Sequence, residues 1–310
     1  MNLNLKLYFL QALRGIAALL VVTDHALLEI SHNDPRNAIT HIAWTLGNAG
    51  VYIFYIISGF IMVHICWESF GRKAAAANFL RRRVIRIVPL YWLATFAALA
   101  YHKVSSTHGA DAGWSELIYS LAFIPYSHDE GSWNPILPQG WTLNYEMMFY
   151  AIFALGLSLP RRFALPAVSM TLGAFVIFGP LVPNETVAYL ASPIVLWFLL
   201  GMALATLWRW RGFEEPEWLA RSAKFMEPLG DASYSTYLVH GLILTILLHV
   251  WMTAVGSPSI WIVPISVTAV AIAGWATYVI IERVILRVIT NFWKPSREIA
   301  TTNLKVSGTS

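Results

Sequence analysis

The sequence predicts an all-α membrane protein, a polytopic bundle of transmembrane helices. Of its 310 residues, 57% are hydrophobic and only 12% are charged, whereas a soluble domain carries about 25% charged residues. The apolar residues gather in eight stretches, each close to the roughly 20 residues that a membrane-spanning helix needs. The lone cysteine, Cys66, can form no internal disulfide. A water-soluble domain and a disulfide-stabilised scaffold are therefore both excluded.

The eight stretches follow one another with short polar connections. The first, 8–30, contains Arg14, is too long for a signal peptide and precedes no small-residue cleavage site, so we expect a permanent helix. Every stretch should be α-helical, because a helix satisfies its own backbone hydrogen bonds inside lipid. The other seven are 48–67, 85–103, 141–159, 163–181, 188–208, 233–252 and 260–282.

The connecting segments complete a single transmembrane domain, expected over residues 1–294. The apolar stretch 117–125 is too short to cross and should be re-entrant or interfacial. Residues 209–231 are expected to form a charged loop. Residues 295–310 are expected to form a disordered cytoplasmic tail.

The basic residues predict the orientation of the helices. If the N-terminus faces the cytoplasm and all eight stretches cross, 18 of the 21 lysines and arginines fall in cytoplasmic segments. Cytoplasmic loops of membrane proteins carry such an excess. Both termini are therefore predicted to be cytoplasmic. A missed pair of helices would preserve the pattern, so the prediction covers eight to ten spans.

Three polar side chains in the first span mark a candidate site. They are Arg14, Asp24 and His25. A charge within the bilayer costs about 2.5–3.5 kcal/mol, so such residues usually face a bundle interior or a wet cavity. Arg14 and His25 are eleven residues apart, about three helical turns, which puts them on one face roughly 16 Å apart. A purely structural contact between helices is the alternative.

Arginines at the cytoplasmic mouth of the third span form a second candidate site. Arg83 and Arg86 are three residues apart and share a helix face. The planar guanidinium binds phosphate oxygens in pairs. The two residues indicate a phosphate-bearing ligand, with anchoring beside anionic lipid as the alternative.

Glu146 is a third candidate, about one turn inside the outer end of the fourth span. The alternative is a carboxylate that reaches back to the outer interface, among ordinary interfacial aromatics. Weaker signals are Ser58-Gly59, the segment 234–240 and Glu282-Arg283, the last of which suggests a structural ion pair or an anchor. The nine histidines are scattered, so no metal site is expected.

Five motifs follow one another along the chain. They are 10–22 followed by His25, 50–60, Arg83-x-x-Arg86-Ile-x-Pro-x-Tyr, 141–146 and 233–240. In this order they resemble the acyltransferase-3 family of integral membrane acyltransferases, over about residues 10–285. They are most similar to the ExoZ-like branch, which is linked to exopolysaccharide acetylation. Two departures are Tyr52, where the family usually has Asp, and Val284, where Pro is common.

The resemblance implies an enzyme that transfers an acyl group, typically acetyl, from cytoplasmic acyl-CoA to a hydroxyl of a cell-surface or exported carbohydrate. In this interpretation His25 is the general base, because histidine ordinarily has a pKa near the working pH. Asp24 or Glu146 would orient the imidazole. Adjacent residues on a helix diverge by about 100°, which favours Glu146 as the orienting group.

The same interpretation assigns the donor-binding residues, the cellular location and the partners. Arg83 and Arg86, extended inward by Arg14, would hold the phosphates of acyl-CoA. The expected location is the inner membrane of a bacterium, with carbohydrate and lipid as partners and no metal or nucleic acid. The acceptor sugar and the oligomeric state stay open.

Two other classes of protein fit the residues. A transporter or flippase of a lipid-linked or acylated sugar would use the intramembrane charges as its pathway, although no inverted repeat or broken helix is visible in the sequence. A non-catalytic subunit of a polysaccharide assembly complex is the other alternative.

Overall fold

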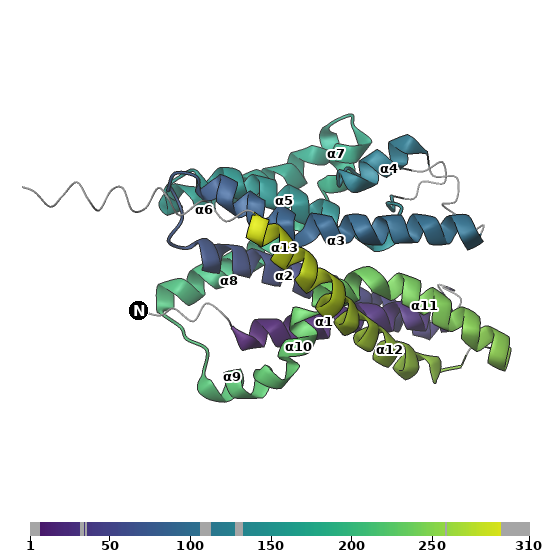
Figure 1. The fold of residues 1–310 in the computed structure, drawn as a ribbon. Helices are drawn as coiled ribbons and strands as arrows, with labels where there is room; N and C mark the ends of the chain where they lie inside the picture. Colours follow the sequence, from purple (N-terminus) through teal and green to yellow (C-terminus); the bar gives the residue numbers. More distant parts are fainter. Residues whose placement is uncertain are drawn as a thin grey trace, which may run out of the picture.

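The computed structural model of the chain is a bundle of α-helices that run roughly along one axis (Figure 1). Within the described residues every regular element is helical and none is a strand, which confirms the all-α prediction. The predicted tail, 295–310, lies outside the described residues. These residues are 7–31, 34, 36–105, 113–127, 133–257 and 259–292.

Eight longer helices match the eight predicted stretches one for one and in order. Six described helical segments are long and apolar enough to cross a membrane, which is typical of a multi-pass membrane protein; the helices corresponding to 8–30 and 141–159 are not among the six. The count of eight spans and the orientation of the termini therefore stay predictions. The helices are α1 (Tyr8–Ser31), α2 (Ala38–Cys66), α3 (Ala75–Ser105), α5 (Trp141–Leu157), α6 (Arg161–Phe178), α8 (Leu196–Arg211), α11 (Ser233–Val255) and α12 (Ile262–Thr277).

Arginines gather where α3 and α6 begin and α8 ends, and we call this the basic end. It is the left end of the bundle in Figure 1. Arg161 Nη1 donates to the carbonyl of Trp67 at 3.1 Å, and Arg209 pairs with Glu68 at 3.6 Å. These contacts bring together the ends of three helices that lie far apart in the sequence. Arg161 and Arg209 therefore serve as structural contacts between these helix ends.

The segment 209–231, predicted to be a charged loop, instead contains two short helices, α9 (Glu217–Ala223) and α10 (Glu227–Asp231). Both pack against α1. The Glu215 carboxylate before them accepts the backbone N–H groups of Tyr8 at 3.1 Å and Phe9 at 2.7 Å. Because the first N–H groups of a helix have no intrahelical partner, this carboxylate caps α1.

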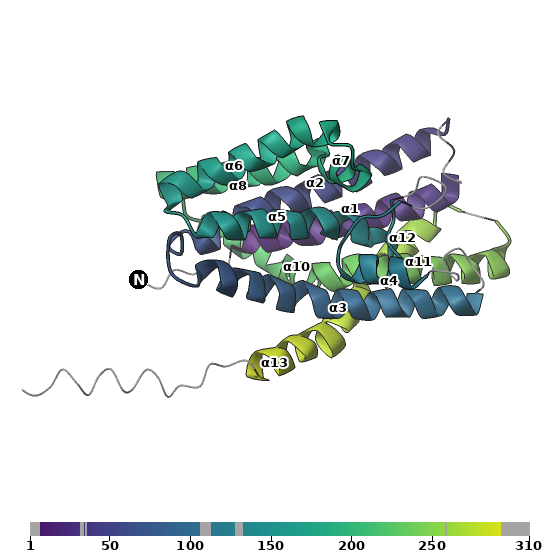
Figure 2. The same ribbon diagram turned by 90° about the horizontal axis from the view of Figure 1, so that it is seen from above.

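The remaining short helices lie around the bundle. Part of the predicted non-crossing stretch, 117–125, lies in α4 (Trp114–Leu121), whose Leu121 carbonyl accepts from the Trp92 indole of α3 at 2.9 Å. The chain passes from α12 through a π-helical turn, Tyr278–Glu282, into α13 (Arg283–Phe292), which leaves the bundle at an angle (Figure 2). The short helix α7 (Glu185–Leu190) precedes α8.

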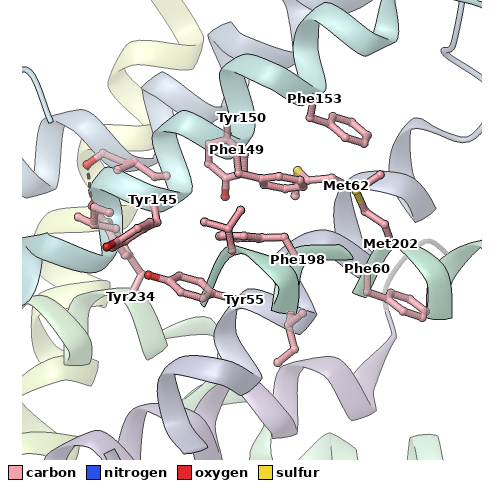
Figure 3. Packing of buried hydrophobic residues seen from close by; sticks show 14 of the residues in the cluster. Tyr55, Phe60, Met62, Tyr145, Phe149, Tyr150, Phe153, Phe198, Met202 and Tyr234 are labelled. Atoms are coloured by element: carbon pink, nitrogen blue, oxygen red, sulfur yellow. Dashed lines mark hydrogen bonds between the residues drawn. The ribbon is translucent and has the colours of Figure 1, made fainter. Parts of the chain in front are cut away.

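The hydrophobic core centres on α2, α5 and α8, where aromatic side chains stack (Figure 3). Phe198 lies between Tyr55 and Phe149, with both ring centroids at 4.4 Å. The backbones of α2 and α8 approach closely through Gly59 and Gly201, where a Cβ would collide with the carbonyl of the facing helix. Small residues permit this close packing of helices in membranes. This core holds α2 and α5 in place, and both helices also carry residues that line the cavity of the candidate site.

Candidate functional site

A cavity of about 440 Å³ lies among α1, α2, α3, α5 and α11. Its lining begins at Leu7, just before α1 and close to the basic end, and includes Arg14 of α1. Its wall on α2 runs from Val51 to Ile65, about 21 Å along the helix axis. The cavity is therefore a long chamber that reaches from the basic end into the middle of the bundle. We call it the arginine chamber.

Arg14, Arg83 and Arg86 all line the arginine chamber. Among the described residues, none of the three has a carboxylate within 4 Å. Arg83 Nε is buried without a hydrogen-bond partner, and its guanidinium lies 5.8 Å from the ring centroids of Phe79 and Tyr150. Unpaired charges are costly away from water, so the chamber is suited to an anionic ligand.

Glu146 lies in the same chamber. Ser58 Oγ donates to its Oε1 at 2.8 Å, and Tyr150 OH donates to the same oxygen. These two hydroxyl groups hold the carboxylate from α2 and from the next turn of α5. Glu146 therefore has a fixed position against the arginines.

A second carboxylate, Glu282, lies buried in the π-helical turn after α12. It accepts a hydrogen bond from Ser235 Oγ at 2.6 Å and lies within electrostatic range of Arg14 and Arg86. Helical π-turns occur frequently at functional sites. Of the described residues that line the chamber, three are arginines and Glu146 is the one carboxylate, so positive side chains outnumber negative ones even when the nearby Glu282 is counted.

The turn of α3 that carries Arg86 is held by α11. Pro89 has no N–H to donate and weakens the helix locally. Tyr234 OH donates to the carbonyl of Ile87 at 2.8 Å. This contact ties the two helices together beside Arg86 and fixes the wall from which its side chain extends.

A second cavity, of about 230 Å³, lies farther from the basic end, between α1, α2 and the chain that leads into α5. Asp24 and His25 line it, and we call it the histidine pocket. Asp24 is 7% exposed and packs over Gly47 of α2, where any side chain would overlap its carboxylate. The side chain of His25, in contrast, is 47% exposed, against 10% for the side chain of Asp24.

The hydrogen bonds of His25 determine which ring nitrogen carries the proton. Nδ1 lies 3.0 Å from the carbonyl oxygen of Val21 and 3.2 Å from Asp24 Oδ2. Both oxygens are acceptors, so Nδ1 must be the protonated nitrogen of the neutral ring, and Nε2 keeps its lone pair. The arrangement prepares His25 to accept a proton at Nε2.

A second imidazole, that of His240 on α11, lies against His25. The ring centroids are 4.9 Å apart and the planes are almost perpendicular, at 77°. His240 Nδ1 donates to the carbonyl of Tyr237 at 2.6 Å, and its Nε2 is buried without a hydrogen-bond partner. His240 is therefore a neutral, acceptor-bearing ring beside the candidate base.

The two cavities share a wall at Val51 and Tyr237, which line both. Tyr237 OH donates to the carbonyl of Gln139 at 3.0 Å and lies 2.8 Å from Thr142 Oγ1. Gln139 Nε2 donates in turn to the carbonyl of Leu238 at 2.7 Å. A hydrogen-bonded cluster thus fixes the wall between the arginine chamber and the histidine pocket.

Comparison with known proteins decides the family. The model of the acyltransferase domain family matches residues 7–226. The chain is also 31% identical, over 79% of its length and 91% of the relative, to the exopolysaccharide production protein ExoZ of Rhizobium meliloti (strain 1021). This chain belongs to the acyltransferase-3 family. Apart from Tyr234 and Tyr237, every described residue that lines the two cavities of this membrane acyltransferase lies in the matched region.

Another relative of this acyltransferase is nodulation protein 10 of Rhizobium leguminosarum bv. viciae. The identity is 27%, over 53% of this chain and 49% of the relative. No solved structure matches the chain.

The structure divides the predicted site residues of the acyltransferase into two groups. Arg14, Arg83, Arg86 and Glu146 come together in the arginine chamber, and Asp24 and His25 line the histidine pocket. The sequence favours Glu146 as the group that orients His25, whereas the carboxylate against the imidazole is that of Asp24.

The reason for this difference is local geometry. Side chains of adjacent residues leave a helix about 100° apart, but the His25 ring folds back along α1 toward Val21, so that Nδ1 reaches the neighbouring Asp24 carboxylate. Glu146 accepts instead from Ser58 and Tyr150.

Three further residues join the site with only weak signals in the sequence. His240 and Tyr237 belong to a motif that the family resemblance includes, but only the fold shows that they lie beside His25 and between the cavities. Glu282 suggests an anchor by sequence, yet it is 2% exposed and lies near Arg14 and Arg86. All three side chains are buried, and this burial, which the sequence does not show, is what distinguishes them from surface residues.

Proposed function

We propose that this acyltransferase transfers an acyl group, acetyl in the simplest case, from cytoplasmic acyl-CoA to a hydroxyl of an exported carbohydrate in the bacterial inner membrane. The observation that carries the proposal is the pair of adjoining cavities, one with unpaired arginines and one with a histidine prepared as a base. The predicted orientation puts the basic end in the cytoplasm, where acyl-CoA is found. The name of the relative, an exopolysaccharide production protein, supports a carbohydrate acceptor.

The arginine chamber fits the donor. Arg83 and Arg86, at the mouth of the chamber, suit the phosphates of acyl-CoA, because guanidinium groups bind phosphate oxygens in pairs. The extended pantetheine arm would then lie along the roughly 21 Å wall on α2, and the thioester would approach Val51 and Tyr237. Glu146 faces this arm and offers an acceptor to its amide N–H groups.

The histidine pocket fits the acceptor side of the reaction. His25 Nε2 takes the proton of the sugar hydroxyl, and Asp24 stabilises the imidazolium that forms. The hydroxyl oxygen forms an ester bond with the thioester carbonyl carbon, the C–S bond breaks, and CoA leaves as the thiolate. The imidazolium returns its proton to that thiolate, so that free CoA and the ester are the products.

Labelled acetyl-CoA tests the proposal directly. Purified protein in detergent would be incubated with acetyl-CoA labelled in the acetyl group and with surface polysaccharide from a strain that lacks the gene. We expect label in the polysaccharide without any ion gradient. His25→Ala should lower kcat by about 10²–10⁴-fold, the usual contribution of a general base.

Arginine variants locate the donor site in the same assay. Arg86→Ala should raise the KM for acetyl-CoA, while Arg36→Ala, whose side chain is 91% exposed at the opposite end, should not. Label that stays on CoA with the wild-type protein would overturn the enzymatic proposal and favour a transporter. Transfer of label by His25→Ala at the wild-type rate would overturn only the role of the histidine and leave the enzymatic proposal in place.

A further inference from the structure

The histidine pocket has a lining that suits a sugar ring. We propose that it binds one neutral pyranose residue of the acceptor, stacked between tryptophan side chains and held by amide groups. This proposal rests on the proposed function and goes beyond it, because it assigns the acceptor site and the charge class of the sugar. The residues that carry it are Trp44, Trp141, Asn48, Asn134, Asp24 and His25.

The tryptophans offer flat apolar surfaces to the C–H face of a sugar. Each ring is braced by a neighbour: Trp44 meets His41 edge-on at 5.7 Å, and Trp141 meets Tyr145 edge-on at 6.0 Å. Bracing keeps the rings in place and lowers the ordering cost of binding. Trp44 is 39% exposed, so it lies at the open side of the pocket, where a ligand can reach it.

Polar groups at the rim match the hydroxyl groups of a pyranose. The amides of Asn48 and Asn134 line the pocket and are both exposed, and each amide can donate and accept hydrogen bonds. On the α1 side of the pocket, Asp24 is buried and the ring of the neighbouring His25 is exposed. A ring held at the rim therefore directs one hydroxyl toward His25 Nε2.

The size of the pocket favours a single ring. Sites that enclose a drug-sized ligand usually measure about 300–1,000 Å³, and this pocket measures about 230 Å³. It has no room for an oligosaccharide. The rest of an acceptor chain would therefore continue outside, past Trp44 and Asn134.

The charge of the lining favours a neutral sugar. No lysine or arginine is among the described residues that line the pocket, whereas the carboxylate of Asp24 is. A uronate or phosphorylated sugar would bring its negative charge close to Asp24 without a compensating cation. Such repulsion between like charges disfavours the anionic ligand.

Matched sugar pairs test both parts of the proposal. The probes are the methyl glycosides of glucose, galactose and mannose, each beside its uronate, which carries a carboxylate in place of the terminal CH₂OH. Saturation-transfer NMR on the protein in lipid nanodiscs reports binding without requiring turnover. We expect at least one neutral glycoside to bind, and its uronate to bind at least tenfold more weakly.

Tryptophan variants then locate the binding. Trp44→Ala should weaken binding of that glycoside about 2- to 12-fold, the size of a lost aromatic stacking contact, and Trp44→Phe should restore most of it. Trp261→Ala, at a residue that is 71% exposed and lines neither cavity, is the matched control. Acetyl-CoA binding should be unchanged in all three variants.

The outcomes separate this proposal from the proposed function. If no acceptor is acetylated but the neutral glycoside still binds in a Trp44-dependent way, the acyl transfer fails and the sugar site stands. If acetylation occurs while uronates bind as well as neutral sugars, or Trp44→Ala binds like the wild type, the sugar site is overturned and acyl transfer stands.

Discussion

Asp24→Asn tests how the structure activates His25. The substitution keeps the size of the side chain, which matters because the Asp24 carboxylate fills the space over Gly47. It removes the negative charge that lies 3.2 Å from His25 Nδ1. The carbonyl of Val21, 3.0 Å from the same nitrogen, stays in place. The variant should therefore keep the productive tautomer and lose only the stabilisation of the imidazolium.

The size of the effect follows from that single lost interaction. A hydrogen bond to a charged group contributes about 1.5–3 kcal/mol, and about 1.4 kcal/mol corresponds to a tenfold change in rate. We therefore expect the kcat of Asp24→Asn to fall about 10- to 150-fold. The KM for acetyl-CoA should not change, because Asp24 lines only the histidine pocket.

Initial rates of labelled acetyl transfer at saturating acetyl-CoA measure this effect. Asp34→Asn is the matched control, since Asp34 pairs with Arg36 at 3.2 Å outside both cavities. An unchanged kcat in Asp24→Asn would falsify the role of the carboxylate. A loss as large as that of His25→Ala would show that Val21 does not hold the tautomer.

Three further variants test individual contacts. Gly201→Ala would place a Cβ 2.8 Å from the carbonyl carbon of Ile56, so the apparent unfolding temperature in detergent should fall, with overpacking costing about 1–3 kcal/mol; an unchanged temperature would contradict the close packing. Glu215→Ala removes the cap of α1 and should cost about 0.5–2 kcal/mol of stability in the same measurement, whereas the exposed Glu217→Ala should cost little. His240→Phe keeps a ring against His25 but removes Nε2 and the Nδ1–H that donates to the carbonyl of Tyr237, so kcat should fall about tenfold and the unfolding temperature should also fall, with the lost hydrogen bond costing about 1–3 kcal/mol; wild-type kcat would assign His240 to packing alone.

The longer helices were predictable because the bilayer allows few backbone structures. A stretch of about 20 apolar residues must form a helix to satisfy its backbone, so the order of the eight longer helices followed from apolar runs alone. The segment 209–231 was not predictable in this way, because its many charged residues leave no apolar run that would indicate α9 and α10. Their inner faces depend on α1 as a packing partner, with Gly230 lying against Gln11.

The sequence singled out some residues of the candidate site but not which of them lie together. Charges inside predicted spans singled out Arg14, Asp24 and His25, since such charges are rarely tolerated without a role. Which helices face one another depends on close contacts such as Gly59 against α8, and these are invisible in one sequence. The structure therefore supplied the division into two cavities and the placement of Glu146 with the arginines.

The wall between the cavities has a physical reason if donor and acceptor lie on opposite faces of the membrane. An open, water-filled passage would let protons and ions follow the membrane potential, which is worth about 2.3 kcal/mol per charge per 100 mV. Tyr237, Thr142 and Gln139 close the passage with hydrogen bonds, and Val51 adds an apolar contact. The hydrogen-bonded contact then needs to open only for the acyl end of an extended donor, so that the thioester carbonyl meets the sugar hydroxyl at His25. The separation of Arg14 from His25 along α1 is thus the distance over which the donor arm, rather than the sugar, has to extend.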